Sequence, residues 1–89
     1  MTIDAHISGS VRVLLFAGLR DRAGRGELTF RADEAPTVDA LAAALERQMP
    51  GLLSGIKVAV AVNGRYERNG ARELAAGDEV AFLPPVSGG

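Results

Sequence analysis

The sequence predicts an α+β domain in which one main helix lies across a single mixed sheet of four to five strands. Four stretches are rich in apolar and β-branched residues with the two-residue alternation of strands, and a fifth has the three- and four-residue spacing of an amphipathic helix. The chain has 89 residues, enough for one domain with one core. Because neither the helix nor the strands could bury an apolar face alone, we expect them to share that core.

The first two predicted strands are 11–19 (VRVLLFAGL) and 27–32 (ELTFRA). The first begins with β-branched and apolar residues, and the second alternates cleanly between apolar and polar residues. Between them lies a polar stretch that contains glycine, RDRAGRG (20–26). We therefore expect a hairpin with a loose loop.

A helix is predicted within 35–51 (APTVDALAAALERQMPG). Thr37 can cap its first turn, and the carboxylate of Asp39 suits the positive end of the helix dipole. Pro50 and Gly51 are expected to end it. The apolar residues with helical spacing are Val38, Leu41, Leu45 and Met49.

The second half of the chain predicts three more strands. Residues 57–64 (KVAVAVNG) read as a strand that runs into an Asn-Gly turn, and 65–68 (RYER) can return as a short strand. Residues 79–83 (EVAFL) form the last strand, and the prolines at 84–85 then stop the pairing and keep the chain extended. The expected organisation is a lead-in at 1–10, a domain at 11–85 and an extended tail at 86–89.

Composition excludes several classes of function. The chain has no cysteine, so it has no disulfide framework, thiolate metal site or thiol nucleophile. Ten basic against eleven acidic residues, without a basic run, argue against nucleic acid as a partner. There is no apolar stretch of membrane-spanning length and no signal peptide, so we expect a soluble, cytoplasmic protein. His6 is interpreted as an ordinary residue of the lead-in, and Tyr66 as packed across the open edge of the sheet.

The glycines between the first two strands and the acidic pair before the last strand do not indicate a catalytic or binding site. Gly18, Gly24 and Gly26 lie between two predicted strands with no helix after them, so a dinucleotide- or phosphate-binding loop lacks its structural context. Asp78 and Glu79 are adjacent, which points them to opposite sides of a strand. A turn and a solvated face are the expected use of this acidic pair. No metal site is expected.

Alternation predicts which side chains of the first and last strands face away from the helix. On that outward face we place Arg12, Leu14 and Phe16 from the first strand and Glu79, Ala81 and Leu83 from the last. If these strands are neighbours, Leu14, Phe16, Ala81 and Leu83 form an apolar patch where the tail leaves the sheet. An exposed patch of this kind indicates a protein interface. The alternatives are an error in the strand phase or a loop that covers this face.

The last four residues, Val86 to Gly89, form a slender tail in which only Val86 and Ser87 have side chains. Extended, they reach about 13 Å at roughly 3.3 Å per residue. Such a tail could enter a channel too narrow for ordinary residues, because glycine permits close approach of another backbone. A terminal carboxylate becomes a good electrophile if a partner converts it to an acyl adenylate. The protein would then be a reagent and not a catalyst.

Four motifs in order, VRVLLFAGLRDRAG, PTVDALAAAL, VAVNG and GDEVAFLPPVSGG, resemble the small-subunit family of molybdopterin synthase, a group of ubiquitin-like sulfur carriers. The resemblance spans residues 11–89, and its most specific part is the ending with an acidic pair, a strand, two prolines and a short tail to Gly-Gly. It implies a β-grasp, ubiquitin-like fold. Leu83 departs from the family pattern, in which an aromatic residue is frequent at this position, so the contact it makes is expected to be smaller.

The resemblance also implies a mechanism. An ATP-dependent, ubiquitin-activating-like enzyme would adenylate the carboxylate of Gly89, and a sulfur donor would convert it to a thiocarboxylate. The tail, with Val86, Ser87 and Gly88, would insert into the large subunit and deliver sulfur to cyclic pyranopterin monophosphate in molybdenum cofactor biosynthesis. The partner-facing residues would be Leu14, Phe16, Arg20, Ala81, Leu83, Pro84 and Pro85.

The resemblance implies that this subunit is non-catalytic and that the catalytic residues lie on the large subunit. The expected assembly has two small subunits flanking a dimer of large ones. No cofactor would be bound to this chain, and the ATP would be used by the activating enzyme. Two alternatives remain. One keeps the activated terminus but changes the acceptor, giving a carrier for thiazole or cysteine synthesis or a modifier attached to lysines. The other is a plain interaction domain with an inert terminus.

Overall fold

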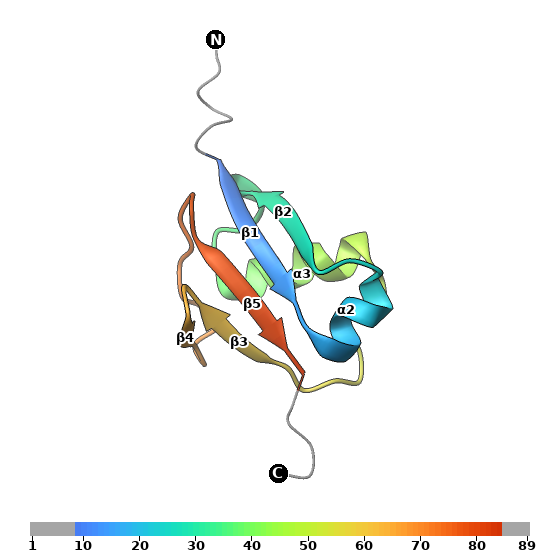
Figure 1. The fold of residues 1–89 in the computed structure, drawn as a ribbon. Coiled ribbons are helices and arrows are strands. Elements are labelled where there is room, and N and C mark those ends of the chain that lie inside the picture. Colours follow the sequence, from blue (N-terminus) through green and yellow to red (C-terminus); the bar gives the residue numbers. More distant parts are fainter. Residues whose placement is uncertain (1–8, 85–89) are drawn as a thin grey trace.

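A computed structural model describes residues 9–84 (Figure 1). Its elements, in chain order, are β1 (Ser10–Leu15), α2 (Ala17–Ala23), β2 (Glu27–Arg31), a short 3-10 helix (Ala32–Glu34), α3 (Val38–Gln48), β3 (Ala59–Val62), β4 (Arg65–Tyr66) and β5 (Glu79–Leu83). Residues 1–8 and 85–89 lie outside the described part, and with them His6 and the whole predicted tail.

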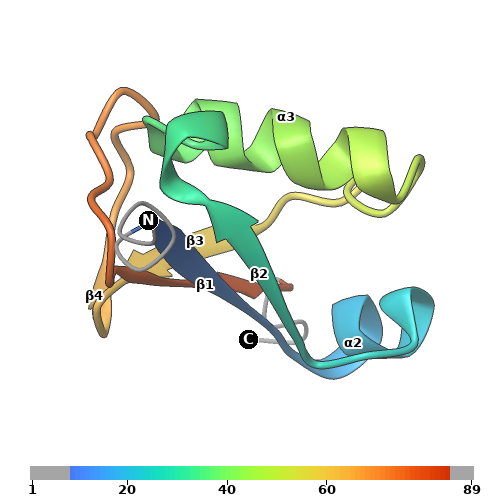
Figure 2. The same ribbon diagram turned by 90° about the horizontal axis from the view of Figure 1, so that it is seen from above.

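The strands form one five-stranded mixed sheet in the order β2-β1-β5-β3-β4. The central pair, β1 and β5, is parallel, and the other neighbours are antiparallel. Seen along the sheet, α3 forms a second layer over one face (Figure 2). This is the β-grasp arrangement, so the predicted fold class, strand number and main helix are confirmed.

The connection between β1 and β2 differs from the prediction. The two strands pair as expected, but β1 ends at Leu15, and the seven-residue helix α2 replaces both the end of the predicted strand and much of the predicted loop. Ala17 has a φ of 49°, in the left-handed region, and turns the chain out of the strand. Leu19, fully buried, anchors the helix to the core, and Gly24 ends it with a φ of 77°. The prediction that no helix follows these glycines is therefore wrong for Gly18, which lies in α2, whereas Gly24 and Gly26 come after the helix and are followed by β2.

Helix α3 begins as the sequence predicts. The Oγ1 of Thr37 accepts a hydrogen bond from the N–H of Ala40 at 3.1 Å, and Asp39 lies in the first turn. The apolar side of the helix faces the sheet, and Leu41 and Leu45 have no exposed surface. The partners of these leucines in the core are on the buried face of the sheet, where Val11, Val13, Leu15, Val62, Val80 and Phe82 are at most 2% exposed.

The loop after α3 is held by one carboxylate. Glu46 accepts hydrogen bonds from the backbone N–H of Gly51, from that of Leu53 at 3.0 Å and from the hydroxyl of Ser54 at 3.4 Å. The bonds from Leu53 and Gly51 stabilise the charged form, so they lower the pKa of Glu46 from its ordinary value. Glu46 thus ties the end of the helix to the segment that leads into β3.

The predicted Asn-Gly turn joins β3 to β4, with φ values of 51° at Asn63 and 84° at Gly64. The side chain of Asn63 also bridges to β5, because its amide donates to Asp78 Oδ1 and its oxygen accepts from the N–H of Glu79. Asp78 in turn accepts from the N–H of Ala75 at 2.8 Å, and this bond together with the one from Asn63 lowers its pKa. Asp78 therefore has the turn role that was predicted.

Candidate functional site: the outward face of the sheet and the end of β5

The face of the sheet opposite α3 has the side chains that alternation predicted. Strands β1 and β5 are neighbours, and their register places Leu14 opposite Ala81 and Arg12 opposite Glu79. Val11, Val13, Val80 and Phe82 point to the core, whereas Leu14, Ala81 and Leu83 are half-buried on the outer side. The predicted strand phase is confirmed. No described residue forms a layer over this face comparable to α3 on the other (Figure 2).

Strand β3 enlarges this apolar surface. Its register with β5 places Ala59 opposite Leu83 and Ala61 opposite Ala81, so both alanines face outward beside them. We define the docking patch as Leu14, Phe16, Ala59, Ala61, Ala81 and Leu83. The largest exposed side chain in it is Phe16, with 43% of its surface open to solvent. Two alanines of the patch were not predicted, although the alternation in AVAV (59–62) would place them together once the pairing of β3 with β5 is known.

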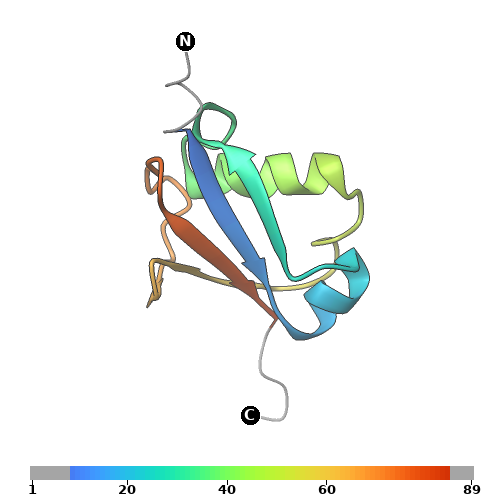
Figure 3. The ribbon, with the colours of Figure 1, turned by 45° about the horizontal axis from the view of Figure 1, so that its top comes forward.

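The docking patch lies at the end of β5 from which the chain continues to the tail. Strand β5 ends at Leu83 beside the connection from β1 to α2 (Figure 3). Pro84 follows and is half-buried. Arg20 is exposed on α2, and its side chain lies against the backbone of Gly26, where an added Cβ would be 3.4 Å from the Arg20 Nε. The described residues among the predicted partner contacts thus gather around one end of the sheet. Pro85, Val86, Ser87, Gly88 and Gly89 lie outside the described residues.

The other end of the outward face is charged. Arg12 lies between two carboxylates, with its Nε 3.0 Å from Glu27 and its Nη1 3.3 Å from Glu79. The hydrogen bond to Glu27 is the main reason why the pKa of Arg12 is raised, and the charges of Glu27 and Glu79 add to it. With one guanidinium and two carboxylates, this cluster has a net charge of −1. The apolar part of the face is therefore confined to the end where β5 leaves the sheet.

Tyr66 does not pack as predicted. It lies opposite Ala61 in the pairing of β3 with β4, and 77% of its surface is exposed. The prediction failed because β4 has only two residues and the methyl group of Ala61 is too small to cover the ring. Tyr66 instead extends the outward face toward the edge of the sheet.

The described part of the chain has neither a metal-binding cluster nor a membrane-spanning helix. Residues 9–84 contain no group of three or more His, Cys, Asp or Glu side chains that could hold a metal ion. Within the same range, no helix has the length and apolar character needed to cross a bilayer. The candidate functional site is therefore the docking patch beside the end of β5.

Comparison with known proteins decides the family. Residues 13–89 match the ThiS family along their whole length. The chain belongs to the ThiS family. The match extends from β1 through Gly89, so it includes the residues beyond β5 that the structure does not describe.

Two curated relatives share 41% of their residues with this chain. Both are named "Molybdopterin synthase sulfur carrier subunit": one, from Chlamydomonas reinhardtii, aligns over 81 residues, and the other, from Escherichia coli K12, over 83. Each alignment covers 89% of this ThiS family chain, and they cover 98% and 99% of the two relatives. The chain thus matches these relatives at nearly full length.

Solved structures of similar fold include SAMP1, a small archaeal modifier protein from Haloferax volcanii. It has a TM-score of 0.78 and 34% identity, and the match covers 91% of this chain and all of SAMP1. A complex of subunits 1 and 2 of the molybdopterin-converting factor from Helicobacter pylori contains a chain with a TM-score of 0.66 and 28% identity. That match covers 90% of this chain and 99% of the other. These neighbours share the β-grasp fold described above.

Proposed function

We propose that this chain is the sulfur carrier subunit of a molybdopterin synthase. The observation that carries the proposal is the 41% identity, at nearly full length, to two proteins of that name, together with a family match that continues to Gly89. The substrate that accepts the sulfur is cyclic pyranopterin monophosphate, and the product is the dithiolene of molybdopterin. The chain supplies the reacting group and not the catalytic residues, which belong to the large subunit.

The reacting group is the carboxylate of Gly89. In the first step a carboxylate oxygen attacks the α-phosphorus of ATP on an activating adenylyltransferase, which forms an acyl adenylate and releases pyrophosphate. In the second step the terminal sulfur of a persulfide donor attacks the acyl carbon and AMP leaves, which gives an acyl disulfide. A thiol then attacks the donor's sulfur in this disulfide, so that the thiocarboxylate leaves and the thiol and donor end as a disulfide. Nothing in this chain has to act as an acid or a base. What the chain must do is present its end to two different partners.

The docking patch suits that task. It is apolar, lies on the face that α3 leaves open, and adjoins the last residues of β5. A partner that covers Phe16 and Leu83 would receive the tail beside the contact, so that Val86, Ser87 and Gly88 can thread a channel while Gly89 reaches the substrate. We propose the large subunit as this partner. The Helicobacter pylori complex of subunits 1 and 2 supports the pairing.

Mass spectrometry tests the chemistry. The chain ending at Gly89 is incubated with ATP, an activating enzyme and a sulfur source, and then with the large subunit and the pyranopterin precursor. We expect a mass increase of one oxygen-to-sulfur exchange on Gly89, followed by conversion of the precursor. A chain with one alanine added after Gly89 should be folded but inactive, whereas Ser87→Ala, the matched change within the tail, should remain active. Normal conversion by the extended chain, without processing back to Gly89, would refute the proposal.

A second candidate function is a protein modifier. It is suggested by the similarity to SAMP1, with a TM-score of 0.78 and 34% identity, which equals in TM-score the putative molybdopterin-converting factor subunit 1 from Pyrococcus furiosus at 31% identity. In that case the acyl adenylate would be attacked by a lysine amine of another protein, with formation of an amide and release of AMP. Tryptic digestion of proteins from cells that express the chain separates the two functions. Lysines that carry residues from the end of this chain would favour the modifier, and a thiocarboxylate without such lysines favours the sulfur carrier.

A further inference from the structure

The two asparagines of the chain are each followed by glycine, as Asn63-Gly64 between β3 and β4 and as Asn69-Gly70 after β4. In such a pair the side-chain amide can be lost spontaneously, when the backbone nitrogen of the glycine attacks the carbonyl carbon of the asparagine side chain. Glycine makes this attack easiest, because it has no Cβ to shield its nitrogen and its backbone is the least restricted. Both asparagines are exposed, so the fold can distinguish them only by how firmly it holds each side chain.

Asn63 is held by bonds to a distant part of the chain. Its Nδ2 donates to Asp78 Oδ1 at 3.0 Å, and its Oδ1 accepts from the N–H of Glu79 at 2.9 Å. Its backbone N–H also donates to the carbonyl of Glu79 at 2.8 Å. Rotation of the side chain toward Gly64 would break both side-chain bonds, while the backbone bond keeps the turn against β5. The fold therefore opposes the reaction at Asn63.

Asn69 is held only by its neighbours in the sequence. Its backbone N–H donates to Glu67 Oε2 at 3.1 Å, and its Oδ1 accepts from the N–H of Ala71 at 3.0 Å. The second bond folds the side chain toward the Gly70 peptide, and it would stabilise negative charge on Oδ1 as the carbonyl is attacked. In the described part of the chain, neither the leaving group, Nδ2 of Asn69, nor the attacking group, the N–H of Gly70, has a hydrogen-bond partner. The fold therefore leaves this pair able to react.

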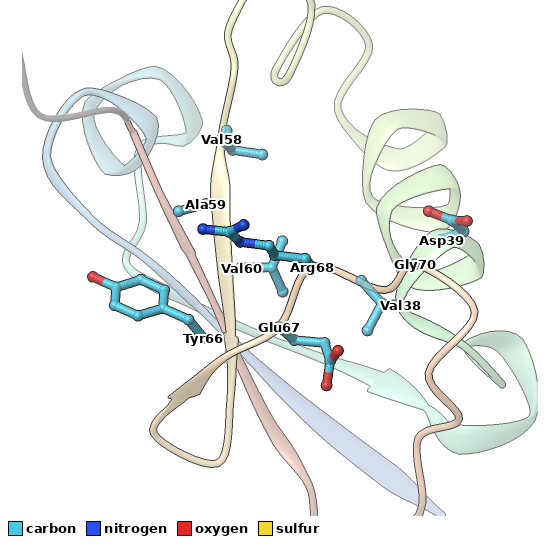
Figure 4. A pocket seen from close by; sticks show the side chains of 9 residues that line it. All are labelled: Val38, Asp39, Val58, Ala59, Val60, Tyr66, Glu67, Arg68 and Gly70. Carbon is cyan, nitrogen blue, oxygen red and sulfur yellow. The ribbon is translucent and has the colours of Figure 1, made fainter.

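Gly70 also supports the start of α3. It lies beside Asp39 in the first turn of the helix (Figure 4), and an added Cβ at position 70 would overlap the Asp39 carboxylate unless that side chain moved. The N–H of Asp39 donates to the carbonyl of Gly70 at 2.9 Å, and that of Val38 donates to the carbonyl of Arg72 at 3.1 Å. These are among the N–H groups that a helix cannot satisfy by itself. The contact that favours glycine at this position thus places the reactive pair where it holds the end of a helix.

We propose that Asn69 is a site of spontaneous deamidation and that β5 protects Asn63 from the same reaction. The nitrogen of Gly70 loses its proton and bonds to Cγ of Asn69, the bond from Cγ to Nδ2 breaks, and ammonia leaves. Water then opens the resulting cyclic succinimide at one of its two carbonyls, so position 69 becomes aspartate or isoaspartate.

The isoaspartate product reaches the helix. Its backbone runs through the former side chain and is one methylene longer just before Gly70. This displaces the carbonyl of Gly70 from the N–H of Asp39 and loosens the start of α3. The site is separate from the chemistry at the carboxyl terminus and does not depend on the proposed function.

The test ages the full chain in mildly alkaline buffer, with and without urea, and follows both asparagines by mass spectrometry of tryptic peptides. Cleavage after Arg65 and Arg68 places Asn63 and Asn69 in separate peptides, and deamidation replaces the NH2 group by OH. In the folded chain we expect Asn69 to react at least tenfold faster than Asn63. In urea no tertiary contact protects either residue, so the two rates should agree within about twofold. Equal rates in the folded chain, or a tenfold difference that persists in urea, would overturn the proposal.

A variant tests the protection of Asn63. Asp78→Ala removes the acceptor of Asn63 Nδ2, so it should speed the reaction at Asn63 at least threefold and leave the rate at Asn69 unchanged. An unchanged rate at Asn63 would overturn the assigned protection. Equal acceleration at both sites would also overturn it, because global stability and not this contact would then protect Asn63.

A second variant tests the effect on the helix. Asn69→Asp has the charge of the product without the longer backbone, so it is the matched control for the isoaspartate form, which ion exchange separates from the aged protein. The isoaspartate form should melt at a lower temperature than Asn69→Asp and exchange the amide hydrogens of Val38 and Asp39 faster. Identical melting and exchange would overturn the proposed effect on α3.

Discussion

Truncation of Phe16 separates the proposed docking role from the fold. Phe16 keeps 43% of its surface exposed, so a little more than half of the side chain is already buried in the isolated protein. Full burial of a phenylalanine side chain contributes about 1.5 to 3 kcal/mol, so Phe16→Ala should lower the free energy of unfolding by only about 1 to 2 kcal/mol. The rest of the ring is available to a partner.

The effect on binding should be larger. Loss of a well-packed aromatic anchor at an interface costs about 2 kcal/mol or more, which is roughly a 30-fold loss of affinity for the large subunit. Leu45→Ala is the matched control, because Leu45 has no exposed surface and lies under the other face of the sheet. It should cost about 2 to 5 kcal/mol in unfolding free energy and leave the affinity of the folded protein unchanged.

Two measurements decide the matter. Urea unfolding followed by far-ultraviolet circular dichroism gives the free energy of each variant, and isothermal titration with the large subunit gives its affinity at a temperature where both variants are folded. The reasoning is refuted if Phe16→Ala destabilises the fold as much as Leu45→Ala does and leaves the affinity unchanged. Phe16 would then be a core residue, and the docking patch would lie elsewhere.

Three further predictions concern the patch, the helix and its loop. Leu83→Asp should weaken binding to the large subunit at least tenfold with little change in melting temperature, measured by titration and thermal scans. Thr37→Ala should cost about 1 kcal/mol in urea unfolding, because the N–H of Ala40 loses its cap. The folded-state pKa of Glu46 is lowered from 4.5, so its contribution to stability is complete above pH 4.5 and is lost as the pH falls through the folded-state pKa. Glu46→Gln should therefore lose less stability on acidification than the parent chain, and identical pH profiles would contradict this.

The sequence by itself determined the features that depend on neighbours along the chain. Alternation in 79–83 correctly separated Val80 and Phe82 from the outward Ala81 and Leu83, because side chains on a strand change face at every residue. The cap at Thr37 and the turn at Asn63 were predicted for the same reason, since each depends on a few adjacent residues. The residues of the tail were also evident from the sequence, although the structure does not describe them.

Only the tertiary structure decided the rest. A helix as short as α2 is not stable alone, so it exists because Leu19 reaches the core, and no local pattern in 16–23 reveals that contact. The contribution of Ala59 and Ala61 to the docking patch depends on β3 pairing with β5, which brings together residues about twenty positions apart. Each of these results from contacts between distant segments, and periodicity along the chain carries no information about which segments meet.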